Sequence, residues 1–283
     1  MGGPPGKFAY VSERNGPTAI WVRAEGWDRP LVTEFDFPSG STRWFMTPAL
    51  SPGADRVIYA RVERDQSHSN WISSVSGGPP VRLTNTEKAV EEGGAWSLDG
   101  SRFAFIQNRN GVFSLMVVQT GGEATPTVLR EKLGWDFLPQ WSPDGRWIAF
   151  FERPPGKTIG GSWNLISPDG KTVRSLAAAN GGEPTVAALT FSADSQRLYG
   201  IRPEQDHNYL FSIDIASDQE KIIGDVGKDF TPNSYLSPGV RLSLSPDGKS
   251  LLFPSFRSNY SLWMLEGFDL PGWAMQLRER LPW

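Results

Sequence analysis

The protein has 283 residues, of which 39% are hydrophobic and 12% aromatic, and it carries a formal net charge of −3 at pH 7. This balance, without a basic run, excludes an electrostatic footprint for nucleic acid or an anionic membrane. The chain has no cysteine for thiol catalysis or disulfides, and no apolar run of 18 residues for membrane insertion.

The first six residues, MGGPPG, lack the apolar core of a signal peptide. Three apolar segments follow at 8–11, 19–22 and 30–33, and they have the length and composition of short strands. A cytoplasmic protein and a domain excised from a longer periplasmic or extracellular protein would both begin in this way. The compartment therefore stays open.

From residue 50 onward, one phrase recurs five times: a large apolar residue, a serine, a tight turn and a short apolar strand. The anchor serines are Ser51, Ser97, Ser142, Ser192 and Ser245, spaced 46, 45, 50 and 53 residues apart. In the turn, proline presets the first corner, aspartate bonds its own backbone, and glycine accepts the left-handed conformation that closes a hairpin. The turns at 52–55 and 193–196 depart from this pattern. A regular period of this length indicates a solenoid, a propeller or an array.

Each repeat continues into a second hairpin, as at 71–84, 115–129 and 163–176. A repeat thus has four antiparallel strands, A to D, and four strands every ~40–50 residues are typical of a propeller blade. We predict an all-β fold: a single β-propeller over 1–270 with six four-stranded blades, its ring closed by joining the N- and C-terminal strands. Residues 271–283 are then a C-terminal tail or the closing segment. The repeats are expected at about 7–34, 49–84, 95–129, 140–176, 190–226 and 243–268.

Turns that read Ser-Pro-Asp-Gly, at 142–145 and 245–248, are each followed by an apolar strand. These phrases resemble the WD40-like repeats of TolB-type propellers, and the resemblance covers residues 7–268. It implies the fold but is a poor guide to function, because such repeats occur in receptors, in scaffolds and in appendages of enzymes. The ending at 261–268 also resembles propeller domains at the C-terminus of bacterial signalling proteins, where the propeller follows a kinase or a DNA-binding module.

Alternating strand direction places the A–B and C–D turns on one face of such a fold, and the B–C loops and D–A crossings on the other. The first set is short in every repeat, whereas the second varies in length. Length variation on one face is where repeat proteins usually carry binding loops. Tolerated insertions are the alternative explanation.

The tryptophans divide into a packing set and a candidate contact set. Seven occupy repeated strand positions and are expected to pack between blades: Trp21, Trp71, Trp96, Trp141, Trp147, Trp163 and Trp263. Trp44 and Trp135 instead each lie seven residues before an anchor serine, near the expected channel mouth on the variable face. With the carboxylate of Asp136, they are the central ligand-contact candidates, since tryptophan is enriched at interface centres. An internal lid that plugs the channel is an equally open alternative.

Arginines recur near the end of strand B and are expected around the rim of the same face: Arg61, Arg109, Arg153 and Arg202. Guanidinium groups in a ring can bind carboxylates or phosphates bidentately. The repeat itself favours another explanation, in which each arginine makes the same contact inside its own blade.

Catalytic constellations find little support in the sequence. The two histidines, His68 and His207, fall in separate repeats and are too few for a histidine-based metal site, and neither a Gly-x-Ser-x-Gly elbow nor a phosphate loop is present. We predict a non-catalytic binding or scaffold propeller for a protein or peptide ligand, without cofactor or metal. A channel-centred hydrolase or lyase that uses carboxylates stays open, as does a sensor domain excised from a kinase or transcription regulator. The sequence does not specify the oligomeric state.

Overall fold

The computed structural model describes residues 6–86, 89–122, 124–133, 138–152, 161–176, 188–204, 207–227, 242–245, 247–255, 261–266 and 276–279. Within these ranges the fold is all-β, with 23 strands and one short 3-10 turn, η1 (Glu34–Asp36). The chain divides into two compact units, 1–133 and 134–283.

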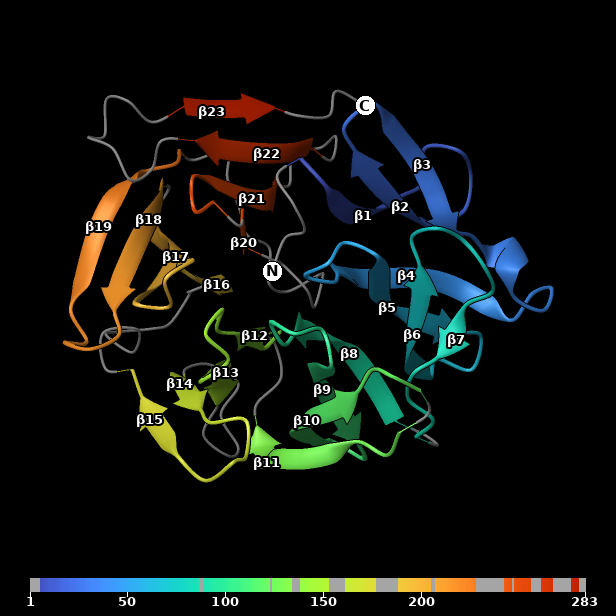
Figure 1. The fold of residues 1–283 in the computed structure, drawn as a ribbon, viewed down its shortest axis with the longest axis horizontal. Coiled ribbons are helices and arrows are strands. Elements are labelled where there is room, and N and C mark those ends of the chain that lie inside the picture. The colour runs from blue at the N-terminus through green and yellow to red at the C-terminus, as the bar shows by residue number, and fades with distance from the viewer. Residues whose placement is uncertain are drawn as a thin grey trace. The chain divides into compact units, whose positions relative to one another are not determined.

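The first unit contains a three-stranded antiparallel sheet and an eight-stranded sheet (Figure 1). The three-stranded sheet consists of β1 (Phe8–Ser12), β2 (Ala19–Ala24) and β3 (Trp27–Val32). The larger sheet consists of β4 (Thr42–Leu50), β5 (Arg56–Glu63), β6 (His68–Ser74), β7 (Val81–Arg82), β8 (Ala89–Trp96), β9 (Arg102–Arg109), β10 (Val112–Gln119) and β11 (Thr127–Leu133). It comprises two consecutive meanders, β4–β7 and β8–β11, which join where β6 and β8 pair in parallel at His68 and Val90.

The second unit contains three four-stranded antiparallel sheets, each a meander in chain order. The first consists of β12 (Gln140–Trp141), β13 (Ile148–Glu152), β14 (Ser162–Ile166) and β15 (Val173–Ser175). The second consists of β16 (Ala188–Phe191), β17 (Arg197–Glu204), β18 (His207–Asp214) and β19 (Glu220–Asp225). The third consists of β20 (Ser243–Leu244), β21 (Ser250–Ser255), β22 (Ser261–Glu266) and β23 (Gln276–Glu279). Strand β23 lies within residues 271–283, which were expected to form either a tail or the closing segment.

The recurring serine turn has one hydrogen-bond pattern in both units. Ser97 Oγ donates to Asp99 Oδ1 at 2.6 Å and accepts the backbone N–H of Arg102 at 3.0 Å. The same two bonds form around the other four anchor serines, with Asp55, Asp144, Asp194 and Asp247 as the acceptors. The repeated aspartates thus hold the turns together, as their turn chemistry predicts.

The two irregular turns keep this geometry in spite of their sequences. Gly100, three residues after its anchor serine, has φ 67°, and the corresponding Ala54 and Ser195 have φ 52° and 59°. A non-glycine residue in this left-handed region costs roughly 1–2 kcal/mol. The serine–aspartate bonds and the strand pairing on either side therefore maintain the turn where glycine is absent.

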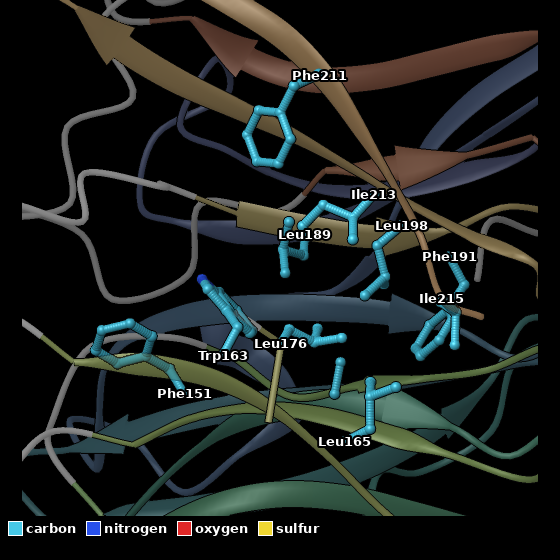
Figure 2. Close-up of a cluster of buried hydrophobic side chains, with 11 residues drawn as sticks. Phe151, Trp163, Leu165, Leu176, Leu189, Phe191, Leu198, Phe211, Ile213 and Ile215 are labelled. Atoms are coloured by element: carbon cyan, nitrogen blue, oxygen red, sulfur yellow. The ribbon is translucent and has the colours of Figure 1, made fainter. Parts of the chain in front are cut away.

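Tryptophans of the predicted packing set lie in or against the apolar clusters. Trp21, Trp96, Trp141 and Trp163 are buried, and Trp71 and Trp147 are partly buried against apolar clusters. The predicted packing between sheets is confirmed for Trp71, Trp96, Trp147 and Trp163, which lie in or against clusters shared by neighbouring meanders. For Trp21 and Trp141 the structure shows burial, and the side chain of Trp263 lies outside the described residues. Figure 2 shows one such cluster, in which Trp163 and Leu165 of β14 face Leu189 and Leu198 of the neighbouring sheet.

Candidate functional site

Three of the seven predicted contact residues, Trp135, Asp136 and Arg153, lie outside the described residues. The structure places the other four, Trp44, Arg61, Arg109 and Arg202, at or near strand ends.

Trp44 lies in a strand and not, as expected, in the connection that precedes the repeat at 49–84. Strand β4 begins at Thr42, seven residues before the expected start of the repeat, because it pairs with β5 back to Glu63. Trp44 lies opposite Val62, and the ring is half-buried beneath the guanidinium of Arg43, whose Cζ is 4.3 Å from the ring centroid.

Arg61 lies inside β5, near the end of the strand, and is only 4% exposed, so it is not presented on an open rim. Its Nε donates to Thr42 Oγ1 at 2.9 Å, and its Nη1 lies 3.3 Å from Glu63 Oε1. The guanidinium covers two rings, with Cζ 4.2 Å from the centroid of Phe37 and 5.3 Å from that of Trp71. Burial lowers the pKa of Arg61, but the guanidinium stays charged at neutral pH.

Arg202 repeats the main features of this arrangement in the second unit. Both arginines lie ten residues after their anchor serine, and Arg202 likewise lies over an aromatic ring of the next strand, 5.3 Å from the centroid of Phe211. Its Nη1 pairs with Glu220 at 2.9 Å. For these two arginines, the structure therefore shows the contact repeated within each sheet. Arg109, the last residue of β9, is exposed.

The β3–β4 connection presents an aromatic side chain that the sequence reasoning missed. In η1, Phe35 is 86% exposed, whereas Phe37 turns inward and packs edge-on against Trp71 at 4.9 Å between centroids. Asp36 holds the turn, because its Oδ2 accepts the backbone N–H of Thr33 at 2.7 Å. No signal in the sequence marks Phe35, because no repeated pattern in this connection fixes which of the two phenylalanines faces inward.

The joint between β6 and β8 contains a second group of polar residues, which are buried except for the partly buried His68. Glu91 of β8 is fully buried, and its carboxylate accepts the hydroxyl of Thr84, the backbone N–H of Asn70 at 3.3 Å and the amide of Gln107 at 3.2 Å. Burial raises the pKa of the Glu91 carboxyl, against the lowering effect of these hydrogen bonds and one from Thr86. We call this group the β6–β8 junction: His68, Asn70, Thr84, Glu91 and Gln107.

Neither the β3–β4 connection nor the β6–β8 junction resembles a metal centre. In the described part of the chain, no three histidine, cysteine, aspartate or glutamate side chains come close enough together to hold a metal ion. Nor does any helix in that part have the length and apolar character needed to span a membrane.

The sequence matches no family model. An uncharacterized protein of Agrobacterium fabrum is 24% identical over 208 residues, which are 70% of this chain and 67% of the relative. The structure of TolB from Acinetobacter baumannii aligns over 97% of this chain with a TM-score of 0.73 at 17% identity, and the chain spans 64% of TolB's length. An oligogalacturonate lyase from Vibrio parahaemolyticus aligns over 97% of this chain and 74% of its own, with a TM-score of 0.64 at 13% identity.

These alignments and the successive meander sheets define the class of fold, which is a β-propeller. More particularly, the fold is TolB-like, as the Ser-Pro-Asp-Gly turns imply. A place at the end of a signalling protein stays a prediction.

Proposed function

We propose that this TolB-like propeller is a non-catalytic binding module that recognises a protein or peptide ligand. It does so through the face that carries the B–C loops and the D–A crossings. The β3–β4 surface, consisting of Phe35, Arg43 and Trp44, forms part of the contact.

The exposure of Phe35 carries this proposal. A phenylalanine ring left in water forgoes about 1.5–3 kcal/mol of burial free energy, yet Asp36 and the inward Phe37 fix the turn that presents it. Tryptophan and arginine are the residues most enriched at interface hot spots, and Arg43 stacks on Trp44 at the start of the following strand. The β3–β4 surface thus combines an apolar ring with a cation.

The rim arginines have different parts in this proposal. Arg109 is exposed and available for a carboxylate of the ligand. Arg61 and Arg202 are engaged with Glu63 and Glu220, so they support the face from within. Trp135, Asp136 and Arg153 remain proposed contacts by their places in the repeat.

We also propose that the ring has six blades and closes by joining its terminal strands. The six successive meanders, the first with three strands and the others with four, support the blade number. A crystal structure would count the blades directly, and any number other than six would refute this part of the proposal.

Peptides selected from a displayed random library on the immobilised protein supply a probe for the function. We expect Phe35→Ser and Trp44→Ala each to weaken binding of a selected peptide by about 30-fold, which corresponds to a hot-spot loss of ~2 kcal/mol. Phe35→Ser should leave the free energy of unfolding within about 0.5 kcal/mol, because the ring is exposed.

Ile222→Ser is the matched control, because Ile222 is an exposed apolar side chain on the outer strand β19. It should leave the dissociation constant unchanged. If neither Phe35→Ser nor Trp44→Ala changes the affinity for the selected peptides, the proposed β3–β4 surface is wrong. Cleavage of oligogalacturonate by the purified protein would favour the lyase alternative.

A further inference from the structure

Asn70 is a polar residue at a repeat position that is apolar elsewhere in the described sheets. It pairs with Ala60, which lies nine residues after its anchor serine. The same register places Leu115, Trp163 and Leu210 in three of the other meanders. All four side chains are fully or almost fully buried, with Asn70 itself 0% exposed. The side chain at this repeat position is therefore buried in each of these meanders, and in β6 it is an amide instead of an apolar group.

The amide has no partner among the described residues. Neither Oδ1 nor Nδ2 of Asn70 makes a hydrogen bond there, and the same holds for Nδ1 of His68, also a buried atom. Leaving a buried donor or acceptor unsatisfied costs about 1–3 kcal/mol for each group. Three such atoms within three residues of one strand call for a ligand of their own.

The two side chains face the same side of the sheet. The pairing of β5 with β6 runs without a bulge, so His68, Asn70 and Ile72 alternate with Ser69 and Trp71. Ile72 packs in the cluster that contains Trp96 of β8, which shows that this side faces the second meander. His68 and Asn70 therefore both point into the joint between β6 and β8.

The Glu91 carboxylate makes no hydrogen bond to the side-chain amide of Asn70. It binds the backbone N–H of Asn70 together with Thr84 and Gln107. What the side chains of Asn70 and His68 require is a small group that both donates and accepts. A cation would satisfy Oδ1 but leave Nδ2 unpaired, whereas water satisfies both.

We propose that Asn70 and His68 bind one or two buried water molecules in the β6–β8 junction. Residues two apart in a strand are about 6.6 Å apart, and two hydrogen bonds of about 2.8 Å each bridge roughly that separation. Buried waters typically make about three hydrogen bonds to polar groups that would otherwise be unsatisfied. The water holds the amide in place at the point where the two meanders join.

A crystal structure of the wild-type protein at high resolution tests this directly. We expect solvent density within about 3.2 Å of Oδ1 or Nδ2 of Asn70. A dry contact, or a protein side chain bonded to the amide, would overturn the proposal.

The sign of the change in Tm on Asn70→Leu is an independent test. Leucine fits this place in the repeat, because it occupies the equivalent positions 115 and 210. If water satisfies Asn70 and His68, the substitution removes their shared partner and should lower Tm by about 3 °C or more. If the amide is an unsatisfied orphan, leucine should raise Tm, and the proposal fails. Leu115→Asn is the matched control, which should lower Tm because it buries an amide between Phe113 and Val117 on the same side of β10.

Discussion

The joints between consecutive meanders differ in chemistry between the two units. In the first unit, β4–β7 meets β8–β11 through buried apolar side chains such as Leu83 and Trp96, and also through the β6–β8 junction, which contains a buried carboxylate and a buried amide. In the second unit, β12–β15 meets β16–β19 through eleven buried apolar side chains, with Trp163 and Phe151 in edge contact at 5.6 Å (Figure 2). Asn70 and Trp163 occupy one position of the repeat. One backbone pattern therefore supports both a joint that contains buried polar groups and a joint formed by a large apolar cluster.

This difference shows which parts of the repeat are free to vary. The serine turns and strand pairings recur in both units and fix the position of each side chain. The side chains that face the neighbouring meander can then differ between repeats, provided that buried polar groups have hydrogen-bond partners. Glu91 meets this condition by binding three protein donors of the junction.

The largest expected effect is on the apolar joint. Trp163→Ala removes a fully buried indole between two sheets and should reduce the free energy of unfolding by about 3–5 kcal/mol. Urea unfolding followed by circular dichroism measures this loss. Trp27→Ala, at a tryptophan 36% exposed, serves as control and should change stability by less than about 1 kcal/mol. Equal losses of unfolding free energy for the two variants would show that packing at this joint does not stabilise the fold more than an exposed tryptophan does.

Most of the fold, but less of the candidate site, could be predicted from the sequence. The five serine phrases predicted the A–B turns because turn chemistry is local, and Ala54 and Ser195 show that pairing maintains those turns even where a glycine is missing. The burial of Trp96 followed from its repeated position. The burial of Arg61 could not be predicted, because the register of β4 against β5, which extends the strand past it, depends on tertiary pairing.

Phe35 and Glu91 were missed for different reasons. The direction of Phe35 depends on how η1 ends, and no pattern repeats there. Glu91 lies six residues before Ser97, at the position of Phe45 in the preceding repeat. Comparing the repeats position by position would have revealed this charge at an apolar place, although not the partners that satisfy it.

A smaller effect, dependent on pH, is expected at the polar joint. Burial is the main cause that raises the pKa of Glu91 in the folded protein. The stabilisation from this carboxyl is therefore fully present below its unfolded pKa, near 4.3, and is lost as pH rises through the folded value. Glu91→Gln does not titrate, so its stability relative to wild type should improve steadily as pH rises.

Urea unfolding of both proteins between pH 4 and pH 8 measures this difference, and carboxylates common to the two cancel. A difference that is constant across this range would mean that the pKa of Glu91 is not shifted. A decline of the variant relative to wild type would mean that the hydrogen bonds outweigh burial and that the junction favours the ionised carboxylate.

The smallest effect is expected in the turns, where the two units are alike. The hydroxyl of Ser97 lowers the pKa of Asp99 to about 2, and the hydroxyl of Ser192 lowers that of Asp194. Asp99→Asn and Asp194→Asn should each cost about 1 kcal/mol or less at pH 7, because the turns are largely solvated. A lowered folded pKa contributes stability above the unfolded value, near 3.9, and this contribution disappears as pH falls towards 2. The deficit of both variants should therefore shrink together on acidification. Unfolding curves at pH 7 and pH 3 check this, and a deficit in only one unit would show that the turns, as well as the joints, distinguish the two.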